Sequence, residues 1–180
     1  MHMLKIVTLP APSLRERSKE IDRDFLLSEK TQKLMDEMIP VMYEHDGVGL
    51  AAPQIGHNIR VCVLAKVADK TLKEELILVN PTWEKISKKK NTDTEGCLSA
   101  PNIFGKVVRY SDIHVEAWDR DGKKLSFDAK KFFARVIQHE CDHLDGILFI
   151  DKATDIYELK DKKKQILGSK NFAEKHTMKI

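Results

Sequence analysis

Two histidines four residues apart, His139 and His143, have a glutamate, Glu140, directly after the first of them. Residues four apart lie on one face of an α-helix, so both imidazoles can bind one metal ion while Glu140 lies about 100° round the helix, near a water on that ion. The pattern indicates metal-assisted hydrolysis. The alternative is that the histidines are structural, or that the spacing arose by chance.

A catalytic metal site of this kind usually has three protein ligands and one open position. Position 149, where one large peptidase group has a histidine, is Phe149, and the later candidates Glu158 and Glu174 lie in or near a charged tail. Cys97 is the better third ligand, although a lone cysteine is also often a buried apolar residue. A thiolate, two imidazoles and an open position suit a divalent ion that activates water.

Hydrophobic periodicity predicts two helices that position this chemistry. The first is capped by Ser28 and runs to Met42, with Pro40 expected to kink or shorten it. The second runs from Ala129 to Leu144, ends near Gly146 and places both histidines on its apolar face. Its opposite side is polar and meets solvent or braces its neighbours, and it carries Arg135, Gln138, Asp142 and Asp145.

A glycine-rich segment, residues 47–56, precedes a run of strands and allows a close approach of the backbone. The strand before Pro81 should end there, and the last two strands should form a hairpin. The predicted strands cover residues 59–65, 75–80, 113–118 and 124–127. This order predicts an α+β fold in which mostly antiparallel sheets pack around a long C-terminal helix with the His-Glu-x-x-His motif.

The composition describes one ordinary globular domain, with 180 residues, 42% hydrophobic and 33% charged. We expect a domain at residues 1–159 and a lysine-rich tail at residues 160–180. Three dispersed cysteines argue against a disulfide framework, and we expect Cys62 and Cys141 to be structural. No apolar run reaches the ~20 residues of a membrane helix and no secretory signal is visible, so we expect no membrane contact and a cytoplasmic location. A net charge of +3 is too balanced to indicate nucleic-acid binding by the whole molecule.

Three segments together resemble the signature motifs of the peptide deformylases, in that family's order. They are Gly-Val-Gly-Leu-Ala-Ala-Pro-Gln at 47–54, Glu-Gly-Cys-Leu-Ser at 95–99 and Gln-His-Glu-Cys-Asp-His-Leu-Asp-Gly at 138–146, and the resemblance spans roughly residues 3–155. It implies an enzyme that removes the formyl group from the N-terminal formylmethionine of nascent polypeptides and releases formate.

The resemblance also implies a role for each site residue. The metal ligands are Cys97, His139 and His143, with Fe²⁺ as the family's normal ion and Zn²⁺, Ni²⁺ or Co²⁺ as alternatives for this donor set. Glu140 moves the proton, and Gln54 and the backbone amide of Leu98 donate to the developing oxyanion. Val48 and Gly49 line the substrate, and Glu95 is expected beside it. Val136 is a candidate pocket wall because it lies close to the ligands, although core packing is an equally good account of it. Glu95 also pairs with Arg109 to brace the metal loop, unless that arginine is solvated and independent.

Two departures from the family pattern concern the pocket rim and the N-terminal segment. Phe104 replaces an arginine common seven residues after the ligand cysteine, which leaves peptide preference open, and Ala11 replaces an acidic residue. The lysine-rich tail is either solvated or makes a transient contact with the ribosome. Two other functional hypotheses stay open. One is a different amidase or peptidase, and the other is a noncatalytic metal module or ribosome-associated adaptor.

Overall fold

The computed structural model describes residues 4–160 and the backbone of residues 163–166. Its longer elements are the helices α1 (Arg23–Leu27), α2 (Glu29–Glu44) and α3 (Lys131–Leu144) and the strands β1 (Gly49–Ala51), β2 (Val61–Leu64), β3 (Leu76–Lys85), β4 (Lys90–Cys97), β5 (Ala100–Tyr110), β6 (Asp112–Trp118), β7 (Lys124–Lys130), β8 (Thr154–Lys160) and β9 (Lys163–Ile166). Short 3-10 turns cover Pro12–Arg15, Ala52–Ile55, Lys66–Ala68 and Phe149–Asp151. No described helix has both the length and the apolar character needed to cross a membrane.

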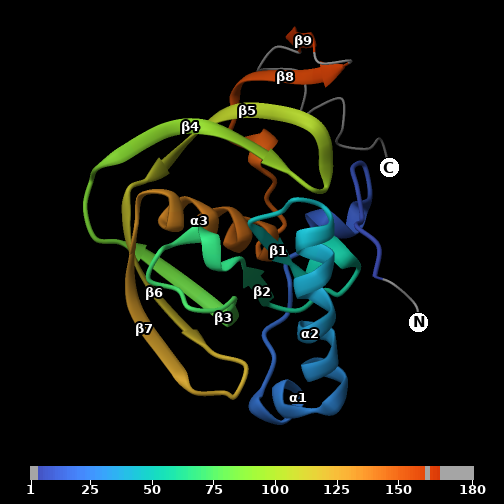
Figure 1. The fold of residues 1–180 in the computed structure, drawn as a ribbon, viewed down its shortest axis with the longest axis vertical. Helices are drawn as coiled ribbons and strands as arrows, with labels where there is room; N and C mark the ends of the chain where they lie inside the picture. The colour runs from blue at the N-terminus through green and yellow to red at the C-terminus, as the bar shows by residue number, and fades with distance from the viewer. Residues whose placement is uncertain (1–3, 161–162, 167–180) are drawn as a thin grey trace.

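The strands form two antiparallel sheets with α3 between them (Figure 1). One has the order β1-β2-β3-β6-β7 and the other β4-β5-β8-β9. Strand β1 and strand β4 each lie at an edge of their sheet. The α+β class, the antiparallel pairing and the central C-terminal helix are therefore confirmed.

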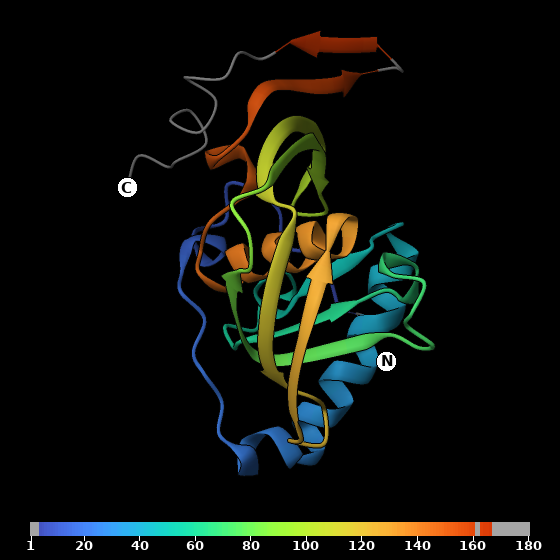
Figure 2. The ribbon, with the colours of Figure 1, turned by 90° about the vertical axis from the view of Figure 1, so that its left-hand side faces the viewer.

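Helices cover both faces of the larger sheet. This explains why every residue of β2 is apolar. Val61 and Val63 pack in one cluster with the apolar stripe of α2, whereas Cys62 and Leu64 pack in another with α3. All four residues are buried because successive side chains of a strand point to opposite faces. Figure 2 shows the sheet between the two helices. The structural role expected for Cys62 and Cys141 is consistent with their place in the second cluster.

Helix α2 begins as predicted but is not shortened by its proline. The Ser28 hydroxyl accepts a hydrogen bond from the Thr31 amide, which caps the helix. Pro40 lies inside the helix, which continues to Glu44. The proline is on the exposed side, where the carbonyl that loses its intrahelical partner can bond water.

The expected end of a strand at Pro81 is wrong, because β3 continues to Lys85. The ladder with β6 shifts register between Val79 and Thr82, and Asn80 adopts a positive φ of 50°. A bulge at this point takes the proline, which cannot donate to the ladder, out of regular pairing.

The segment around Cys97, which is not among the predicted strands, belongs to the β4–β5 hairpin. Cys97 is the last residue of β4, and Ala100 opposite it begins β5. A register shift between Gly96 and Cys97 accompanies the tight connection. This hairpin is the main part of the fold that the periodicity did not reveal.

Helix α3 begins at Lys131, two residues later than predicted, because Ala129 still pairs with Ile113 in the β6–β7 hairpin. Its end agrees with the prediction, since Gly146 follows with a φ of 71°. A β-carbon at Gly146 would lie 2.7 Å from the carbonyl carbon of Arg15, so the chain can cross there only over a glycine.

The predicted boundary at residue 159 falls inside a strand, because β8 runs to Lys160. The backbone of β9 pairs with β8 and so continues the smaller sheet into the lysine-rich segment. The rest of the predicted tail lies outside the described residues.

Candidate metal centre

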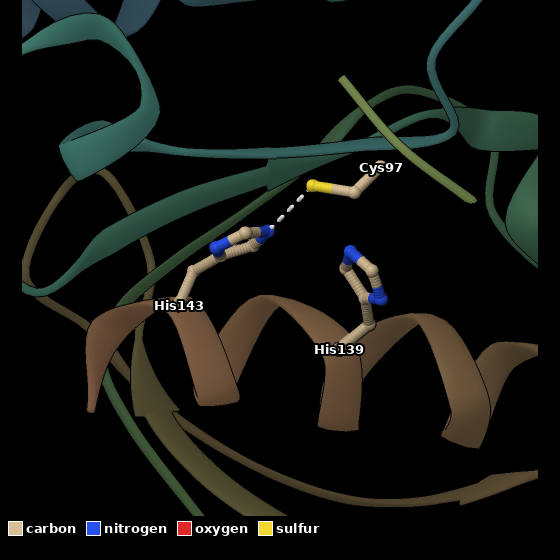
Figure 3. A group of neighbouring side chains, drawn as sticks. All are labelled: Cys97, His139 and His143. Atoms are coloured by element: carbon tan, nitrogen blue, oxygen red, sulfur yellow. Dashed lines mark hydrogen bonds between the residues drawn. The ribbon is translucent and has the colours of Figure 1, made fainter. Parts of the chain in front are cut away.

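The two histidines of α3 lie one turn apart on the side of the helix that faces β4. Their rings are 5.0 Å apart between centroids and 74° apart in plane. Cys97, at the end of β4, points toward the same space, and its Sγ is 3.2 Å from His143 Nε2 (Figure 3). The ligand atoms of Cys97, His139 and His143 all lie within 4.8 Å of one another. The convergence expected from the sequence is therefore present.

Glu95 holds His139 in position from behind. His139 Nδ1 forms a hydrogen bond with Glu95 Oε2 at 2.9 Å. The other ring nitrogen, Nε2, is therefore left to face Cys97. Arg109 donates to both oxygens of Glu95, from Nε at 2.9 Å and from Nη2 at 2.8 Å, and Arg135 also donates to Oε1. The predicted pair of Glu95 and Arg109 exists, and Arg109 is buried rather than solvated.

Burial alone would raise the pKa of Glu95, but hydrogen bonds from Arg109 and His139 outweigh it and hold the pKa well below its usual range. The carboxylate is therefore ionised and occupied by three partners. Although Glu95 lines the pocket, its oxygens brace the site, so the structure favours a positioning role for it over direct contact with substrate.

Three of the four residues predicted on the polar side of α3 contact neighbouring elements and are shielded from solvent. Arg109 also pairs with Asp142, which accepts from Lys152 Nζ at 2.7 Å. Gln138 bonds the backbone of Tyr110 in both directions, at 2.8 and 3.1 Å. Arg135, Gln138 and Asp142 are all buried. These contacts fix α3 against β5, and so fix the histidines against Cys97.

Glu140 lies beside the histidines with its carboxyl group in a buried place. Its Oε2 has no hydrogen-bond partner among the described residues. Burial raises the pKa of Glu140 to about 7. The side chain fits because Gly49 has none: a β-carbon at Gly49 would lie 2.8 Å from the Glu140 carboxyl carbon. Gly49 thus allows the close approach predicted for its segment, and the group that approaches is Glu140.

Gln54 follows β1 in a 3-10 turn and is oriented by both ends of its amide. Its Oε1 accepts from the Ala51 amide at 2.8 Å, and its Nε2 donates to Ser99 Oγ at 3.2 Å and to Cys97 Sγ at 3.5 Å. Only 2% of Gln54 is exposed, so it is not an ordinary surface amide. Its N–H groups face the metal ligands, where a donor could meet a developing negative charge.

A pocket of about 550 Å³ opens onto these groups. It runs between β1 and β4, the edge strands of the two sheets. Every predicted site residue except His143 lines it, and His143 is buried behind Cys97. Val48 is 36% exposed and Val136 is 4% exposed. The pocket wall also includes His45, Asp46, Gly47, Thr94, Gly96, Pro101, Asn102, Phe104, Phe132 and Arg135.

The donors of this cluster fit a divalent transition-metal ion. One sulfur and two imidazole nitrogens are borderline-soft ligands. Among the described residues, no fourth His, Cys, Asp or Glu belongs to this cluster. Burial lowers the pKa of His143 well below its usual value, which keeps its ring neutral as a ligand must be. Phe149 is buried and stacks on His139 with centroids 6.2 Å apart, so the position of the peptidase histidine is part of the core.

A model of the polypeptide deformylase family matches residues 3–158. The chain belongs to this family. A peptide deformylase of Pelotomaculum thermopropionicum is 46% identical over 159 residues, which cover 88% of this chain and 97% of that one. The family is metal-dependent, and Cys97, His139 and His143 form a site that can hold the ion.

Solved deformylase structures have the same fold. A peptide deformylase from Legionella pneumophila is 38% identical with a TM-score of 0.77, covering 85% of this chain and 87% of that one. A class I type b deformylase from Acinetobacter baumannii, solved with Met-Ala-Ser bound, is 31% identical with a TM-score of 0.76, covering 84% and 98%. The chain spans only 55% of the length of a plant relative, peptide deformylase 1B of Arabidopsis thaliana, to which it is 42% identical.

Two residues that hold the predicted site residues in place were not predicted from the sequence. Arg135 binds Glu95, and a signal for it existed, because it lies four residues before His139 and so one turn away. Ser99, which is fully buried, accepts from Gln54 and follows Cys97 by two residues. Its role depends on the β4–β5 turn, which the periodicity did not predict.

Proposed function

We propose that this chain is a metal-dependent hydrolase that removes the formyl group from the N-terminal formylmethionine of newly made polypeptides and releases formate. The observation that carries the proposal is the open cluster of Cys97, His139 and His143 with the Glu140 carboxyl beside it in a pocket. Family membership supports the reaction, and the Met-Ala-Ser bound to the Acinetobacter baumannii relative corresponds to the peptide left after deformylation.

Cys97, His139 and His143 would hold the ion. When bound, such an ion polarises the formyl oxygen and lowers the pKa of the attacking water. Glu140 takes a proton from that water as its oxygen bonds to the formyl carbon, and returns it to the nitrogen as the carbon–nitrogen bond breaks. The products are formate and the free α-amine.

Negative charge that develops on the formyl oxygen requires donors already aimed at it. We assign this part to the Gln54 side chain and the Leu98 amide, since Gln54 is held by Ala51 and Ser99 with its amide nitrogen toward the ligands. The long contact from Gln54 Nε2 to Cys97 Sγ, at 3.5 Å, would be exchanged for one to the formyl oxygen, while the bonds to Ala51 and Ser99 keep the amide in place.

The peptide would extend between the two edge strands that border the pocket. Backbone groups at an edge can pair with an added extended segment, and Gly49 and Val48 offer such an edge at β1. Val136 supplies an apolar wall for the methionine side chain. Glu95, whose oxygens are taken, contributes to this site by holding His139.

The discriminating experiment compares formate release from formyl-Met-Ala-Ser with cleavage of acetyl-Met-Ala-Ser, with and without a chelator. We expect formate from the first peptide, at least 100-fold slower turnover of the second, and loss of activity with chelator that returns on adding Fe²⁺. Cleavage of internal peptide bonds, or equal turnover of both peptides, would favour another amidase or a peptidase. No turnover of either with metal bound would favour a noncatalytic module.

We further propose Fe²⁺ as the working ion, with Zn²⁺, Ni²⁺ or Co²⁺ able to occupy the same donors. Ferrous iron beside a thiolate is prone to oxidation. Protein prepared without oxygen should therefore contain iron and release formate faster than aerobic protein. Equal rates for iron-loaded and zinc-loaded protein would contradict iron dependence.

We propose a cytoplasmic location, supported by three free thiols, and a transient contact of the tail with the ribosome. The support for the second is the lysine-rich sequence of residues 160–180 and the nascent-chain substrate. Co-sedimentation with ribosomes should weaken with salt and weaken in a K162Q/K163Q/K164Q variant. Binding that is independent of salt, or equal in the variant, would contradict an electrostatic contact of the tail.

A further inference from the structure

Six lysines gather at one corner of the molecule where three separate chain segments meet. The connection between β3 and β4, the junction of β5 with β6 and the junction of β7 with α3 lie side by side there (Figure 2). Backbone hydrogen bonds join them: Ser111 donates to the Lys89 carbonyl at 2.9 Å, and Lys131 donates to the Ser111 carbonyl at 2.7 Å. We call this surface the basic corner, and its lysines are Lys85, Lys88, Lys89, Lys90, Lys130 and Lys131.

These lysines are exposed, and none of them forms an ion pair with another residue that the structure describes. The carboxylate built into the corner, Asp112, is half-buried and accepts a hydrogen bond from Ser87 at 3.1 Å. Local positive charge is therefore concentrated here, although the net charge of the whole chain is only +3.

Tyr110 holds two of the ammonium groups close together. The Nζ atoms of Lys90 and Lys85 lie 4.7 and 5.6 Å from the centre of its ring, so they are at most about 10 Å apart. Because this upper limit is close to the screening length of about 8 Å at physiological ionic strength, the two exposed charges repel each other only weakly. A bound anion would remove this repulsion and release counterions.

An exposed aromatic ring adjoins the lysines. Phe132 follows Lys131 in the first turn of α3, is 48% exposed and also lines the rim of the pocket. An exposed ring next to lysines in the chain can stack on an unpaired base while the lysines contact phosphates. This combination favours RNA over an anionic membrane, which would be met by a broader apolar surface.

We propose that the basic corner binds the phosphate backbone of RNA beside the mouth of the pocket. The six lysines of the corner are neither tail residues nor residues assigned to deformylation, so the inference goes beyond the proposed function. A protein bound to RNA through this corner would have the Phe132 side of its pocket close to that RNA. A peptide that emerges beside the RNA would then be near the pocket.

The test is fluorescence anisotropy of a short labelled RNA hairpin with single-stranded flanks, measured with the full chain between about 50 and 200 mM KCl. The corner variant is K88Q/K89Q/K131Q, which spares the lysines on Tyr110. The matched control, K70Q/K73Q/K123Q, removes three exposed lysines elsewhere. A third variant, K162Q/K163Q/K164Q, removes the same charge from the tail.

We expect the corner variant to bind RNA at least 10-fold more weakly and to reduce the slope of log affinity against log salt by about two. The control should stay within about twofold, and formate release from a short peptide should be unchanged in all three variants. Equal losses in the corner and control variants, a loss confined to the tail variant, or corner-dependent binding to phosphatidylglycerol vesicles without RNA binding would each overturn the proposal. RNA binding needs no deformylase activity, so the two proposals can fail separately.

Discussion

The Glu140 carboxyl group occupies the space that a side chain at Gly49 would fill. A β-carbon on Gly49 would be 2.8 Å from the Glu140 carboxyl carbon and 2.9 Å from Cγ, closer than real β-carbon contacts. Gly49 belongs to β1 of the larger sheet, and Glu140 belongs to α3. The glycine therefore fixes where the Glu140 carboxyl group, which we propose transfers the proton, can lie.

Replacing Gly49 by alanine should displace Glu140 and lower kcat for deformylation by about 100-fold, a typical loss for a misplaced acid-base group. Metal content should stay unchanged, because the three atoms nearest to the added β-carbon all belong to Glu140 and not to a ligand. The comparison is G47A, whose β-carbon would meet the Leu98 side chain at 3.0 Å and the Met42 carbonyl oxygen at 3.1 Å, contacts that do not involve Glu140. We expect that variant to lose less than about 10-fold. Equal losses for the two variants would contradict the role of Gly49.

Gln54 gives a second prediction. The Gln54→Leu variant removes the amide that faces Cys97 while keeping most of the volume, so kcat should fall by about 100-fold or more. The Gln54→Glu variant keeps the acceptor for the Ala51 amide but replaces the donor, and should be equally slow. Near-normal kcat in the leucine variant would remove Gln54 from the oxyanion site.

Glu95 should matter for both folding and metal affinity. Glu95→Gln leaves Arg109 and Arg135 buried without their full counter-charge, so we expect the free energy of unfolding to fall by about 3 kcal/mol. Loss of the carboxylate behind His139 should weaken metal affinity by about 10-fold or more. Urea unfolding and metal titration measure the two effects.

The control for Glu95 is Glu37→Gln, which breaks an exposed pair with Lys33. That change should cost less than about 0.5 kcal/mol and leave metal affinity unchanged. If E95Q proved as stable as E37Q, the buried network would not be holding the site.

The three cysteines should differ in reactivity. Burial raises the pKa of Cys62 and of Cys141, and both lie in the core, whereas Cys97 lines the pocket. An aromatic disulfide reagent should therefore modify about one thiol in chelated native protein, none in metal-loaded protein and all three after unfolding. Modification of two or more thiols in the native protein would contradict this assignment.

Phe104 should influence peptide preference. Its ring packs on Gly96 beside Cys97 and stacks on Tyr157 with centroids 5.7 Å apart, so it forms an apolar part of the pocket wall. Phe104→Arg should raise kcat/KM for formyl-Met-Glu relative to formyl-Met-Ala by about fivefold, as an added cation near an acidic side chain would. V108R, on the same strand but outside the pocket wall, should leave the ratio unchanged. An unchanged ratio in both variants would place Phe104 outside the peptide path.

The sequence was most informative where one face of an element carries the signal. The period of α3 placed His139 and His143 together, and the uninterrupted apolar run of β2 reflects burial on both faces. Strand β4 has no alternation of apolar and polar residues, because its residues from Lys90 to Glu95 are all polar. The prediction that a strand ends at Pro81 was wrong for a related reason. Strand β3 continues past the proline through a bulge, and this bulge depends on pairing with β6.

The site residues were predictable to the extent that each belongs to a short motif. The network behind them was predicted only in part. The pair of Glu95 and Arg109 was expected, but the sequence left open whether the polar side of α3 meets solvent or braces its neighbours. The burial of Arg135, Gln138 and Asp142 depends on the smaller sheet, which brings Arg109 and Glu95 across the helix. A single helical period cannot show that a polar face will be covered by polar partners.

The most direct test of the central claim measures metal content and formate release in the same samples of the Glu140→Gln variant and the unaltered protein. We expect about one metal ion per chain in both, because Glu140 is not one of the proposed ligands Cys97, His139 and His143. Turnover should be at least 1,000-fold slower in the variant, within the range for general acid-base groups. Normal turnover in the variant, or full metal occupancy in a protein lacking both Cys97 and His143, would contradict the central claim.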